Sequence, residues 1–368
     1  MVFRKSSLES VVVNKDFWTG KKVLITGHTG FKGSWLSLWM QHFSAEIIGV
    51  SLAPPSTPNL FEEANVADGM ITFHQDIRDG EAIKKIFLDH EPEIVFHLAA
   101  QPLVLYSYQH PVETYTSNII GTMHILEAIR SINTVKAAVL ITSDKCYENM
   151  EWEKAYTETE PMGGGDPYSS SKGAAELLIA AYRKSYFSDK QFEQHTTAIA
   201  SARAGNVIGG GDWAQDRLIP DILRALEKEL TISIRNPDST RPWQHVLEPL
   251  AGYLTLAELL YSEGNQYAEA WNFGSPAEDT KPVNWVVEHM IEAWGEQASW
   301  TVDTDDYPKE ANYLKLDCSK AQQRLHWYPR WNLEMALVKV IEWHQARNNG
   351  TSPKEICINQ IVEYQNTE

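Results

Sequence analysis

The sequence has few cysteines, no long apolar run and a deficit of positive charge. Its three cysteines, Cys146, Cys318 and Cys357, are widely spaced, which excludes a disulfide framework and a CxxC zinc site and favours a reducing compartment. No apolar run approaches the roughly 18–20 residues that span a bilayer. Residues 1–16 contain only a run of three valines, too short for the core of a signal peptide. We therefore expect a cytoplasmic protein.

The charge balance excludes polyanionic partners. The 368 residues include 32 Lys and Arg against 49 Asp and Glu, for a formal net charge of −17. Such a charge repels phosphate backbones and anionic lipid headgroups, so neither nucleic acid nor a membrane is expected as a partner. The 12 histidines form no HExxH motif or comparable cluster, and no metal site is predicted.

The first half of the chain alternates strand-like and helix-like segments at the spacing of βαβ units. Six apolar segments predict strands at 22–26, 46–52, 71–75, 93–100, 136–143 and 196–203. Strands that are apolar almost throughout, and separated by helices, indicate a parallel sheet covered on both faces. The prediction is an α/β fold with a doubly wound (Rossmann) parallel sheet.

The alternation becomes irregular after about residue 205. Short strand candidates are interspersed there with predicted helices near 217–229, 246–262, 282–294 and 332–347. We predict a dinucleotide-binding domain over 17–205, a smaller mixed α/β lobe that mainly binds substrate over 206–347, and a loosely held tail over 350–368. No Pro/Gly/Ser-rich linker marks the boundary between domain and lobe.

The first predicted strand runs into a glycine-rich turn at the start of a helix. The turn consists of Gly27, His28, Thr29, Gly30, Phe31, Lys32 and Gly33. Glycine permits a tight turn and lets backbone N–H groups approach a pyrophosphate at the positive end of a helix dipole. The spacing is GxxGxxG, and an ordinary strand–helix turn is the alternative. Lys32 is either a cation for phosphate or simply an exposed lysine.

The end of the second predicted strand does not choose between NAD and NADP. Residues 49–53, GVSLA, contain neither an acid nor an arginine that could contact the adenine ribose. After the third strand, Asp76 and Ile77 could hold an adenine amino group. The alternative for Asp76 is a cap on the helix predicted over 79–90.

A tyrosine and a lysine one helical turn apart give the second chemical signal. Tyr168 and Lys172 are spaced i, i+4 and so share a helix face. An ammonium beside a phenol lowers the pKa of the phenol from about 10 and lets it act as a base near neutral pH. Ser143 ends the fifth predicted strand, where a parallel sheet exposes catalytic groups. Isolated YxxxK pairs are common on helix surfaces, but the glycine turn, serine and tyrosine–lysine pair in this order indicate one site.

With these motifs the sequence resembles the extended short-chain dehydrogenase/reductase family, in the branch that acts on nucleotide sugars. The resemblance runs from about residue 17 to 347 and includes segments 97–101, 111–114 and 118–122. Segments 26–35, 140–147 and 201–213 are similar to those of the CDP-glucose 4,6-dehydratases within that branch. The resemblance implies a tightly held NAD and CDP-glucose as the substrate.

The resemblance also implies catalytic roles. Tyr168, assisted by Ser143 and Lys172, would take a proton while C4 of the sugar is oxidised by NAD. Lys145 would then remove the C5 proton, at a position where dTDP-glucose dehydratases carry a glutamate, and Asp144 would protonate the departing C6 hydroxyl. Lys145 would have to be neutral, and Asp144 shielded from solvent. Return of the hydride to C6 would give CDP-4-keto-6-deoxy-D-glucose. An ordinary charged turn is the alternative for residues 144–145.

The binding residues implied by the motifs and the resemblance fall into two sets. The cofactor set comprises Gly27, His28, Thr29, Gly30, Phe31, Lys32, Gly33, Asp76, Ile77, Leu98, Ala99, Ala100, Tyr168 and Lys172. The substrate set comprises Gln101, Arg203, Asn206, Arg217 and Arg241. By resemblance Asn206, Arg217 and Arg241 hold the diphosphate, because arginine suits bidentate contact with phosphate. Surface salt bridges are the alternative for each arginine.

Three other functions remain open: a nucleotide-sugar 4-epimerase, a 4,6-dehydratase for another nucleotide sugar, and a non-catalytic dinucleotide sensor. An epimerase does not need the acid at Asp144, and a sensor has no use for Ser143, Tyr168 and Lys172 together. The resemblance further implies a homodimer or homotetramer, and deoxysugar biosynthesis for bacterial surface polysaccharide such as the lipopolysaccharide O-antigen.

Overall fold

The protein is built on one seven-stranded parallel sheet. A computed structural model describes residues 13–188, 190, 192–295, 298–303 and 313–367. The strand order is β10-β6-β5-β4-β1-β2-β3. The strands are β1 (Lys22–Thr26), β2 (Glu46–Ser51), β3 (Ile71–His74), β4 (Ile94–His97), β5 (Ala137–Ile141), β6 (Ala198–Ala204) and β10 (Ala270–Phe273). The predicted doubly wound parallel sheet is confirmed. Residues 1–12, which make up most of the N-terminal segment in which no signal peptide is expected, lie outside the described residues.

The direction of winding reverses between β1 and β4. Thr26, the last residue of β1, pairs with Val50 of β2 on one side and with His97 of β4 on the other. In an open α/β sheet the carboxyl ends of the strands diverge at such a switch point and leave a crevice for a ligand. The glycine turn follows β1 and segment 98–101 follows β4, so both border this crevice.

Two hydrophobic cores cover the two faces of the sheet. Successive residues of a strand point to opposite faces, and Leu24 accordingly packs in one core while Val23 and Ile25 pack in the other. The face with Leu24 is covered by α4 (Gly80–His90), α7 (Thr122–Arg130) and α8 (Pro167–Ser185). The opposite face is covered by α2 (Phe31–His42), α11 (Leu247–Glu263) and α15 (Pro353–Asn366).

The long helix that begins at Pro111 and ends at Arg130 contains a π-helical turn. It consists of α6 (Pro111–Tyr115), the π turn η1 (Thr116–Gly121) and α7. Thr122 Oγ1 donates a hydrogen bond of 2.8 Å to the carbonyl oxygen of Asn118 within this turn. Turns of this kind in helices occur frequently at functional sites.

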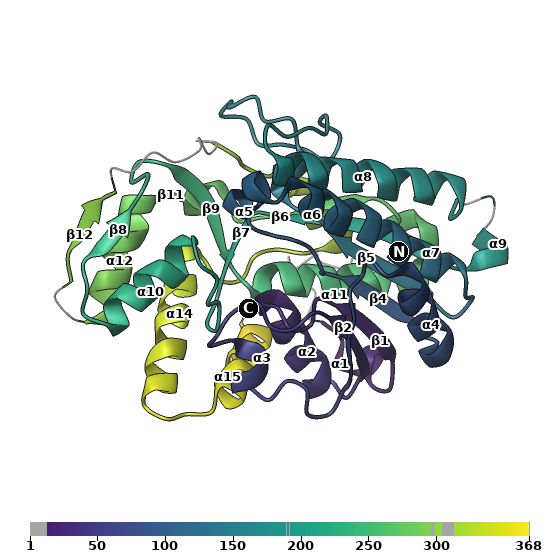
Figure 1. The fold of residues 1–368 in the computed structure, drawn as a ribbon, viewed down its shortest axis with the longest axis horizontal. Coiled ribbons are helices and arrows are strands. Elements are labelled where there is room, and N and C mark those ends of the chain that lie inside the picture. Colours follow the sequence, from purple (N-terminus) through teal and green to yellow (C-terminus); the bar gives the residue numbers. More distant parts are fainter. Residues whose placement is uncertain (1–12, 189, 191, 296–297, 304–312, 368) are drawn as a thin grey trace, which may run out of the picture.

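A second lobe has its own core. It contains the small sheet of β7 (Asn206–Ile208), β9 (Thr240–His245) and β11 (Thr280–Pro282), and the parallel pair β8 (Ile232–Ile234) and β12 (Trp300–Val302). Its helices are α10 (Leu218–Glu227), α12 (Val283–Trp294) and α14 (Leu333–Asn348), which lie together on the left of Figure 1. Between these elements the chain returns to the main sheet through α11 and β10, so segment 247–273 belongs with the first core.

Short helices and turns make up the rest of the described fold. The helices are α1 (Lys15–Trp18), α3 (Leu60–Glu63), α5 (Val104–Gln109), α9 (Phe192–His195) and α13 (Ser319–Leu325). The single turns are η2 (Asp144–Cys146), η4 (Gly264–Tyr267) and η5 (Ala277–Asp279). Among the described residues, no helix has the length and apolar character needed to span a membrane.

The C-terminal segment differs from the expected loosely held tail. Residues Pro353–Asn366 form α15, which packs against α2 and α14. The Tyr364 hydroxyl donates a hydrogen bond of 2.7 Å to the buried carboxylate of Glu248 in α11, and the Arg330 guanidinium donates to three carbonyl groups near the end of α15. The helix is held because its apolar face and its last carbonyl groups both find partners in the fold.

The buried Glu248 and the half-buried Glu258 should make stability depend on pH. Burial raises the pKa values of Glu248 and Glu258 to about 7, above the ordinary value of about 4.3 in an unfolded chain. A raised carboxyl pKa stabilises the fold at low pH and loses this contribution as pH rises through the folded value. Each of these two groups should contribute a fall in the free energy of unfolding in urea between pH 5 and pH 7.5, against the rise contributed by buried neutral histidines such as His28. Glu248→Gln should reduce that fall by up to about 3 kcal/mol.

The control for this prediction is Glu355→Gln on the exposed face of α15, which should leave the pH dependence as in the unmodified protein. An unchanged pH dependence in Glu248→Gln and in Glu258→Gln would contradict the prediction.

Candidate functional site

A cleft of about 550 Å³ separates the carboxyl ends of the main-sheet strands from the second lobe. Nine residues predicted from the sequence line it: Phe31, Lys32, Ser143, Asp144, Lys145, Tyr168, Asn206, Arg217 and Arg241. They come from the turns after β1 and β5, from α8, and from β7, β9 and the start of α10. The fold thus brings most of the predicted catalytic and substrate residues into one cavity.

The glycine turn is closely packed against the end of β4. Gly27 has φ +75°, and a Cβ atom there would lie 2.7 Å from the backbone nitrogen of Ala99. A Cβ atom on Gly33 would lie 2.1 Å from the carbonyl oxygen of Gly27. Gly30 is the N-cap of α2 and provides no side-chain cap, so the first N–H groups of the helix remain open to an anion. This turn therefore fits the pyrophosphate of a dinucleotide.

The side chains of His28 and Thr29 support the turn from behind. The buried His28 ring lies against Gly49 of β2, and burial lowers its pKa to about 4. Thr29 Oγ1 donates to the carbonyl oxygen of Leu52 at 2.9 Å and lies 2.7 Å from Ser51 Oγ. The glycine turn is thereby bound to the end of β2, where the sequence offers no charged residue to contact a ribose.

Asp76 is held by Arg78. The Arg78 guanidinium and backbone N–H both donate to the Asp76 carboxylate, and the hydrogen bonds from Arg78 lower the pKa of Asp76. The cap of α4 is Asp79, whose carboxylate accepts from the Ala82 N–H at 3.1 Å. The alternative role of Asp76 as the helix cap is therefore not what the structure shows.

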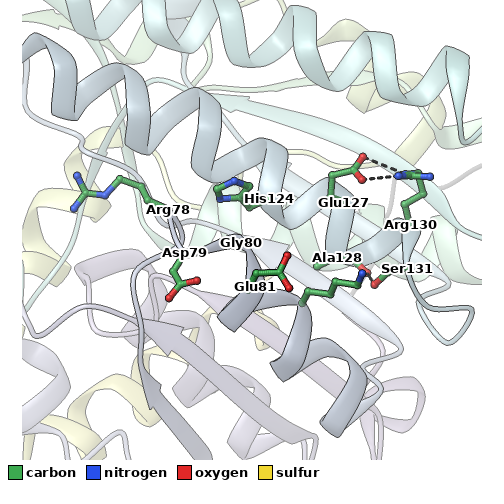
Figure 2. Close-up of a pocket in the computed structure, with 10 residues that line it drawn as sticks. Arg78, Asp79, Gly80, Glu81, His124, Glu127, Ala128, Arg130 and Ser131 are labelled. Carbon is green, nitrogen blue, oxygen red and sulfur yellow. Dashed lines mark hydrogen bonds and ion pairs between the residues drawn. The ribbon is translucent and has the colours of Figure 1, made fainter.

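A second hollow of about 880 Å³ lies beside Arg78, between the start of α4 and the end of α7 (Figure 2). Acidic and basic side chains both line it, and Arg130 forms an ion pair with Glu127 at 2.6 Å. None of its lining residues also lines the cleft. The predicted catalytic residues are therefore not part of this hollow.

Tyr168 and Lys172 are both buried, and of the two only Tyr168 lines the cleft. A hydrogen bond with Ser143 lowers the pKa of Tyr168, but burial is the larger effect and raises it to about 12. Burial, with the charge of Lys32 as a smaller cause, lowers the pKa of Lys172 to about 8. The expectation that Lys172 brings the Tyr168 pKa below 10 is thus not met in this structure, because burial penalises the phenolate.

Asp144 and Lys145 follow Ser143 in the turn η2. Ser143 Oγ donates to Asp144 Oδ1 at 3.0 Å and accepts from the Lys145 backbone N–H at 3.2 Å. Asp144 is only 4% exposed, and burial raises its pKa although Lys145 and Arg241 act in the opposite direction. The shielding expected for a proton donor at Asp144 is present. Lys145 is half-buried and lines the cleft.

Arg203 does not lie where the sequence predicts. Its buried guanidinium pairs with Glu176 of α8 at 2.8 Å and donates to the Tyr147 hydroxyl at 2.7 Å. The Glu176 carboxylate also accepts from Thr142 and Ser201. Arg203 is not among the residues that line the cleft, so the structure disagrees with a substrate-binding role. The guanidinium instead neutralises a buried carboxylate.

Gln101 positions a loop of the cleft wall. Its Nε2 donates to the Leu103 carbonyl and to Thr114 Oγ1, and its Oε1 accepts from the Leu103 N–H. Residues 102–105 line the cleft whereas Gln101 does not. Gln101 therefore lies beside the cleft, where its side-chain amide shapes the adjoining loop, and its contact with substrate stays a prediction.

The lobe side of the cleft carries charge of both signs. Arg217, the N-cap of α10, pairs with Asp212 at 3.2 Å, and Arg241 lies buried on β9. Lys32 faces these groups, and its pKa falls to about 8, first through burial and then through the charge of Arg217. Residues of this wall that the sequence analysis missed include Asp212, Ser233, Asn236, Trp243 and Val283. Apart from Asp212, which lies in segment 201–213, they carry no local motif and meet only through the fold.

Comparison with known proteins places the chain. The family model described as GDP-mannose 4,6 dehydratase matches residues 24–340. The chain belongs to this family. The predicted membership of the nucleotide-sugar branch of the extended short-chain dehydrogenases/reductases is confirmed.

Relatives of the GDP-mannose 4,6 dehydratase family cover nearly the whole chain. A CDP-glucose 4,6-dehydratase of Salmonella typhimurium is 52% identical over 353 residues, 96% of this chain and 98% of the relative. The dTDP-glucose 4,6-dehydratase of Bacillus anthracis, solved in complex with NAD, is 21% identical, with a TM-score of 0.72 over 91% of this chain and 100% of that chain. The UDP-glucose 4-epimerase of Thermotoga maritima, solved with UDP-glucose, is also 21% identical, with a TM-score of 0.75 over 89% and 99% of the two chains. The two structures establish the shared fold.

Arg203 forms a buried ion pair and Arg217 a partly exposed one, so the loss of each arginine should change stability by a different amount. Arg203→Ala should lower the free energy of unfolding in urea by about 3–5 kcal/mol, because it leaves the Glu176 carboxylate buried without a counter-charge. Arg217→Ala breaks a partly exposed pair and should cost less than about 1 kcal/mol.

The double variant Arg203→Ala/Glu176→Ala serves as the matched control, and it should cost less than the two single changes added together. Equal losses for Arg203→Ala and Arg217→Ala would show that the buried pair does not stabilise the fold.

Proposed function

We propose that the protein catalyses the NAD-dependent 4,6-dehydration of CDP-D-glucose to CDP-4-keto-6-deoxy-D-glucose. The observation that carries the proposal is that one cleft contains both Ser143 with Tyr168, suited to oxidation at C4, and Asp144 with Lys145, suited to loss of water. The name of the Salmonella typhimurium relative, at 52% identity, supports this choice of nucleotide and reaction.

NAD fits the glycine turn by its local geometry. Gly27, Gly30 and the open N-terminus of α2 would hold the pyrophosphate, and the end of β4 at Ala99 leaves room only for glycine at position 27. Bound there, NAD would supply reversible hydride transfer. The Bacillus anthracis dehydratase was solved with NAD, which supports NAD as the cofactor, since segment 49–53 contains neither an acid nor an arginine to decide between NAD and NADP.

Side chains of the protein would transfer the protons of the reaction. Tyr168, which forms a hydrogen bond with Ser143, would accept the proton of the C4 hydroxyl. The C4 ketone acidifies the C5 hydrogen, which Lys145 in neutral form would remove. Asp144 would donate its proton to the departing C6 hydroxyl, and its raised pKa favours the protonated form that this step requires.

The two parts of the fold would divide the substrate between them. Residues 17–205 would bind the cofactor and carry the catalytic groups, and the lobe within 206–347 would hold the nucleotide. Asn206, Arg217 and Arg241 line the lobe side of the cleft and would bind the diphosphate. These positive groups give an anionic ligand a favourable site inside a protein of net charge −17.

The protein would act as a homo-oligomer in the cytoplasm. Exposed apolar side chains, including Val112, Tyr115 and Leu177, lie on the adjacent helices α6 and α8, and a second copy of the chain would cover them. All three cysteines are free thiols, as a reducing compartment requires. The product would supply deoxysugars for surface polysaccharide such as O-antigen. Sedimentation velocity measures whether the protein is at least a dimer.

Isotope incorporation tests the reaction. Incubation with CDP-glucose and NAD in deuterium oxide should give a 6-deoxy-4-keto product that carries deuterium at C5, because the C5 proton is exchanged through Lys145. Mass spectrometry and proton NMR read the product. CDP-galactose as the product would indicate an epimerase, reaction only with dTDP- or UDP-glucose would correct the nucleotide, and bound NAD without turnover of any nucleotide sugar would indicate a sensor.

Lys145→Ala separates oxidation from water loss. The variant should bind NAD as the unmodified protein does and still oxidise C4, but its rate of dehydration should fall by at least about 10²-fold, the usual contribution of a general base. Transient absorbance of reduced NAD at the nicotinamide band measures the first step, and 6-deoxy-4-keto product measures the second. Normal product formation by Lys145→Ala would eliminate this role. Tyr168→Phe is the matched comparison, since it should abolish both steps.

A further inference from the structure

A buried chain of side chains connects the switch point of the sheet to the π turn. Thr26 Oγ1 at the end of β1 lies 2.7 Å from His97 Nδ1 at the end of β4. His97 Nε2 lies 2.9 Å from Thr122 Oγ1 at the start of α7. Thr26, His97 and Thr122 are all less than 5% exposed. The mechanism above uses none of the three.

The hydrogen-bond partners fix the donor and the acceptor in each hydrogen bond between Thr26, His97 and Thr122. Thr122 donates its hydroxyl proton to the Asn118 carbonyl oxygen at 2.8 Å. The Thr122 oxygen must therefore accept from His97, and the imidazole proton must be on Nε2. In a neutral ring His97 Nδ1 is then an acceptor, and Thr26 donates to it. Thr26 Oγ1 in turn accepts from the Ala99 backbone N–H at 3.1 Å. Each polar group has a partner of the right kind only in this one tautomer.

The surroundings of His97 favour the neutral ring. Burial, with the nearby charge of Lys172 as a further cause, lowers the pKa of His97 to about 3. A cationic His97 would place two positive charges close together in a buried site and would remove the acceptor of the Thr26 hydroxyl proton at Nδ1. The neutral ring avoids both costs.

The hydrogen-bonded series Thr26–His97–Thr122 ends at two different parts of the site. On the Thr26 side it holds the Ala99 N–H, at the segment against which Gly27 packs. On the Thr122 side it holds the π turn, where Asn118 Nδ2 donates to Ser171 Oγ at 2.8 Å. Ser171 belongs to α8 and donates to the Tyr168 carbonyl at 2.7 Å. One imidazole thus lies between the cofactor turn and the helix of the proposed base.

We propose that His97 is a positioning residue that sets these two parts against each other, as a neutral imidazole with its proton on Nε2. Through Nδ1 it orients Thr26 and the segment that would border the cofactor. Through Nε2 it holds the π turn and, by way of Asn118 and Ser171, the backbone that carries Tyr168. The inference rests on the proposed function for its kinetic test, but not for its tests by NMR and by NAD binding.

The tautomer can be measured directly. In protein labelled with ¹⁵N-histidine, His97→Gln identifies the resonances of residue 97 by their loss. We expect the unmodified protein to show one neutral ring with Nε2–H and an unprotonated Nδ1, unchanged from pH 5.5 to pH 8.5. A ring with Nδ1–H, or one that becomes doubly protonated in this range, would overturn the proposal.

Two substitutions each preserve one half of the imidazole. Asparagine places an acceptor near the position of Nδ1, and glutamine places a donor near that of Nε2. His97→Asn should keep NAD affinity within about threefold and lower kcat at least tenfold. His97→Gln should weaken NAD binding at least tenfold, measured by calorimetry, with a smaller effect on kcat at saturating NAD.

The neighbouring threonines are the matched controls. Thr122→Val should behave as His97→Asn does, and Thr26→Val as His97→Gln does, because each removes the partner of the nitrogen concerned. If all four variants lowered only the melting temperature, or changed NAD affinity and kcat in equal proportion, His97 would be a structural residue alone. Should the His97 variants fail to fold, the threonine variants and the NMR tautomer decide the question.

Failure of the proposed function gives a different pattern. If the unmodified protein binds NAD but converts no nucleotide sugar, the dehydratase proposal fails, and the tautomer and the split in NAD affinity still test His97. If the unmodified protein converts CDP-glucose and the variants do so with unchanged kcat and NAD affinity, the inference about His97 fails alone.

Discussion

The reversal of strand order between β1 and β4 is the constraint on which the site depends. The connections that follow β1 and β4 run to opposite sides of the sheet. A crevice therefore lies between the carboxyl ends of the two strands as a consequence of the topology. The close approach of Gly27 to Ala99 and the contact of Thr26 with His97 both follow from this pairing. The glycine turn proposed for a pyrophosphate and the anchor of the helix that carries the proposed base are therefore consequences of one topological feature.

Burial, more than charge pairing, sets the chemistry of the cleft. It raises the pKa values of Asp144 and Tyr168 and lowers those of Lys32 and Lys172. A shielded acid and poised amines are what proton transfer near neutral pH requires. The same low dielectric explains why Arg203 and Glu176 neutralise each other inside the fold. The net charge of −17 describes the whole chain, whereas the cleft lining sets Lys32, Lys145, Arg217, Arg235 and Arg241 against Asp144, Asp212, Asp216 and Asp221.

Local sequence patterns predicted the elements of the fold closely. The apolar segments of the first half became β1 to β6, and the predicted helices after residue 205 became α10, α11, α12 and α14. The patterns failed where a segment depended on distant partners. Helix α15 has a sparse apolar face that is held by Glu248 and Arg330 from other elements, and the π turn inside the long helix leaves no mark in hydrophobic periodicity.

The sequence by itself determined the parallel sheet, the glycine turn and the order of serine, tyrosine and lysine, because each of these follows from the residue's own geometry or from short spacings along the chain. Only the tertiary structure decided which charged groups meet. Arg203 and Arg241 are both arginines beside short motifs, yet one is buried against Glu176 and the other lines the cleft. The different positions of the two arginines are decided by residues far apart in the sequence, which come into contact only when the sheet and the lobe pack together.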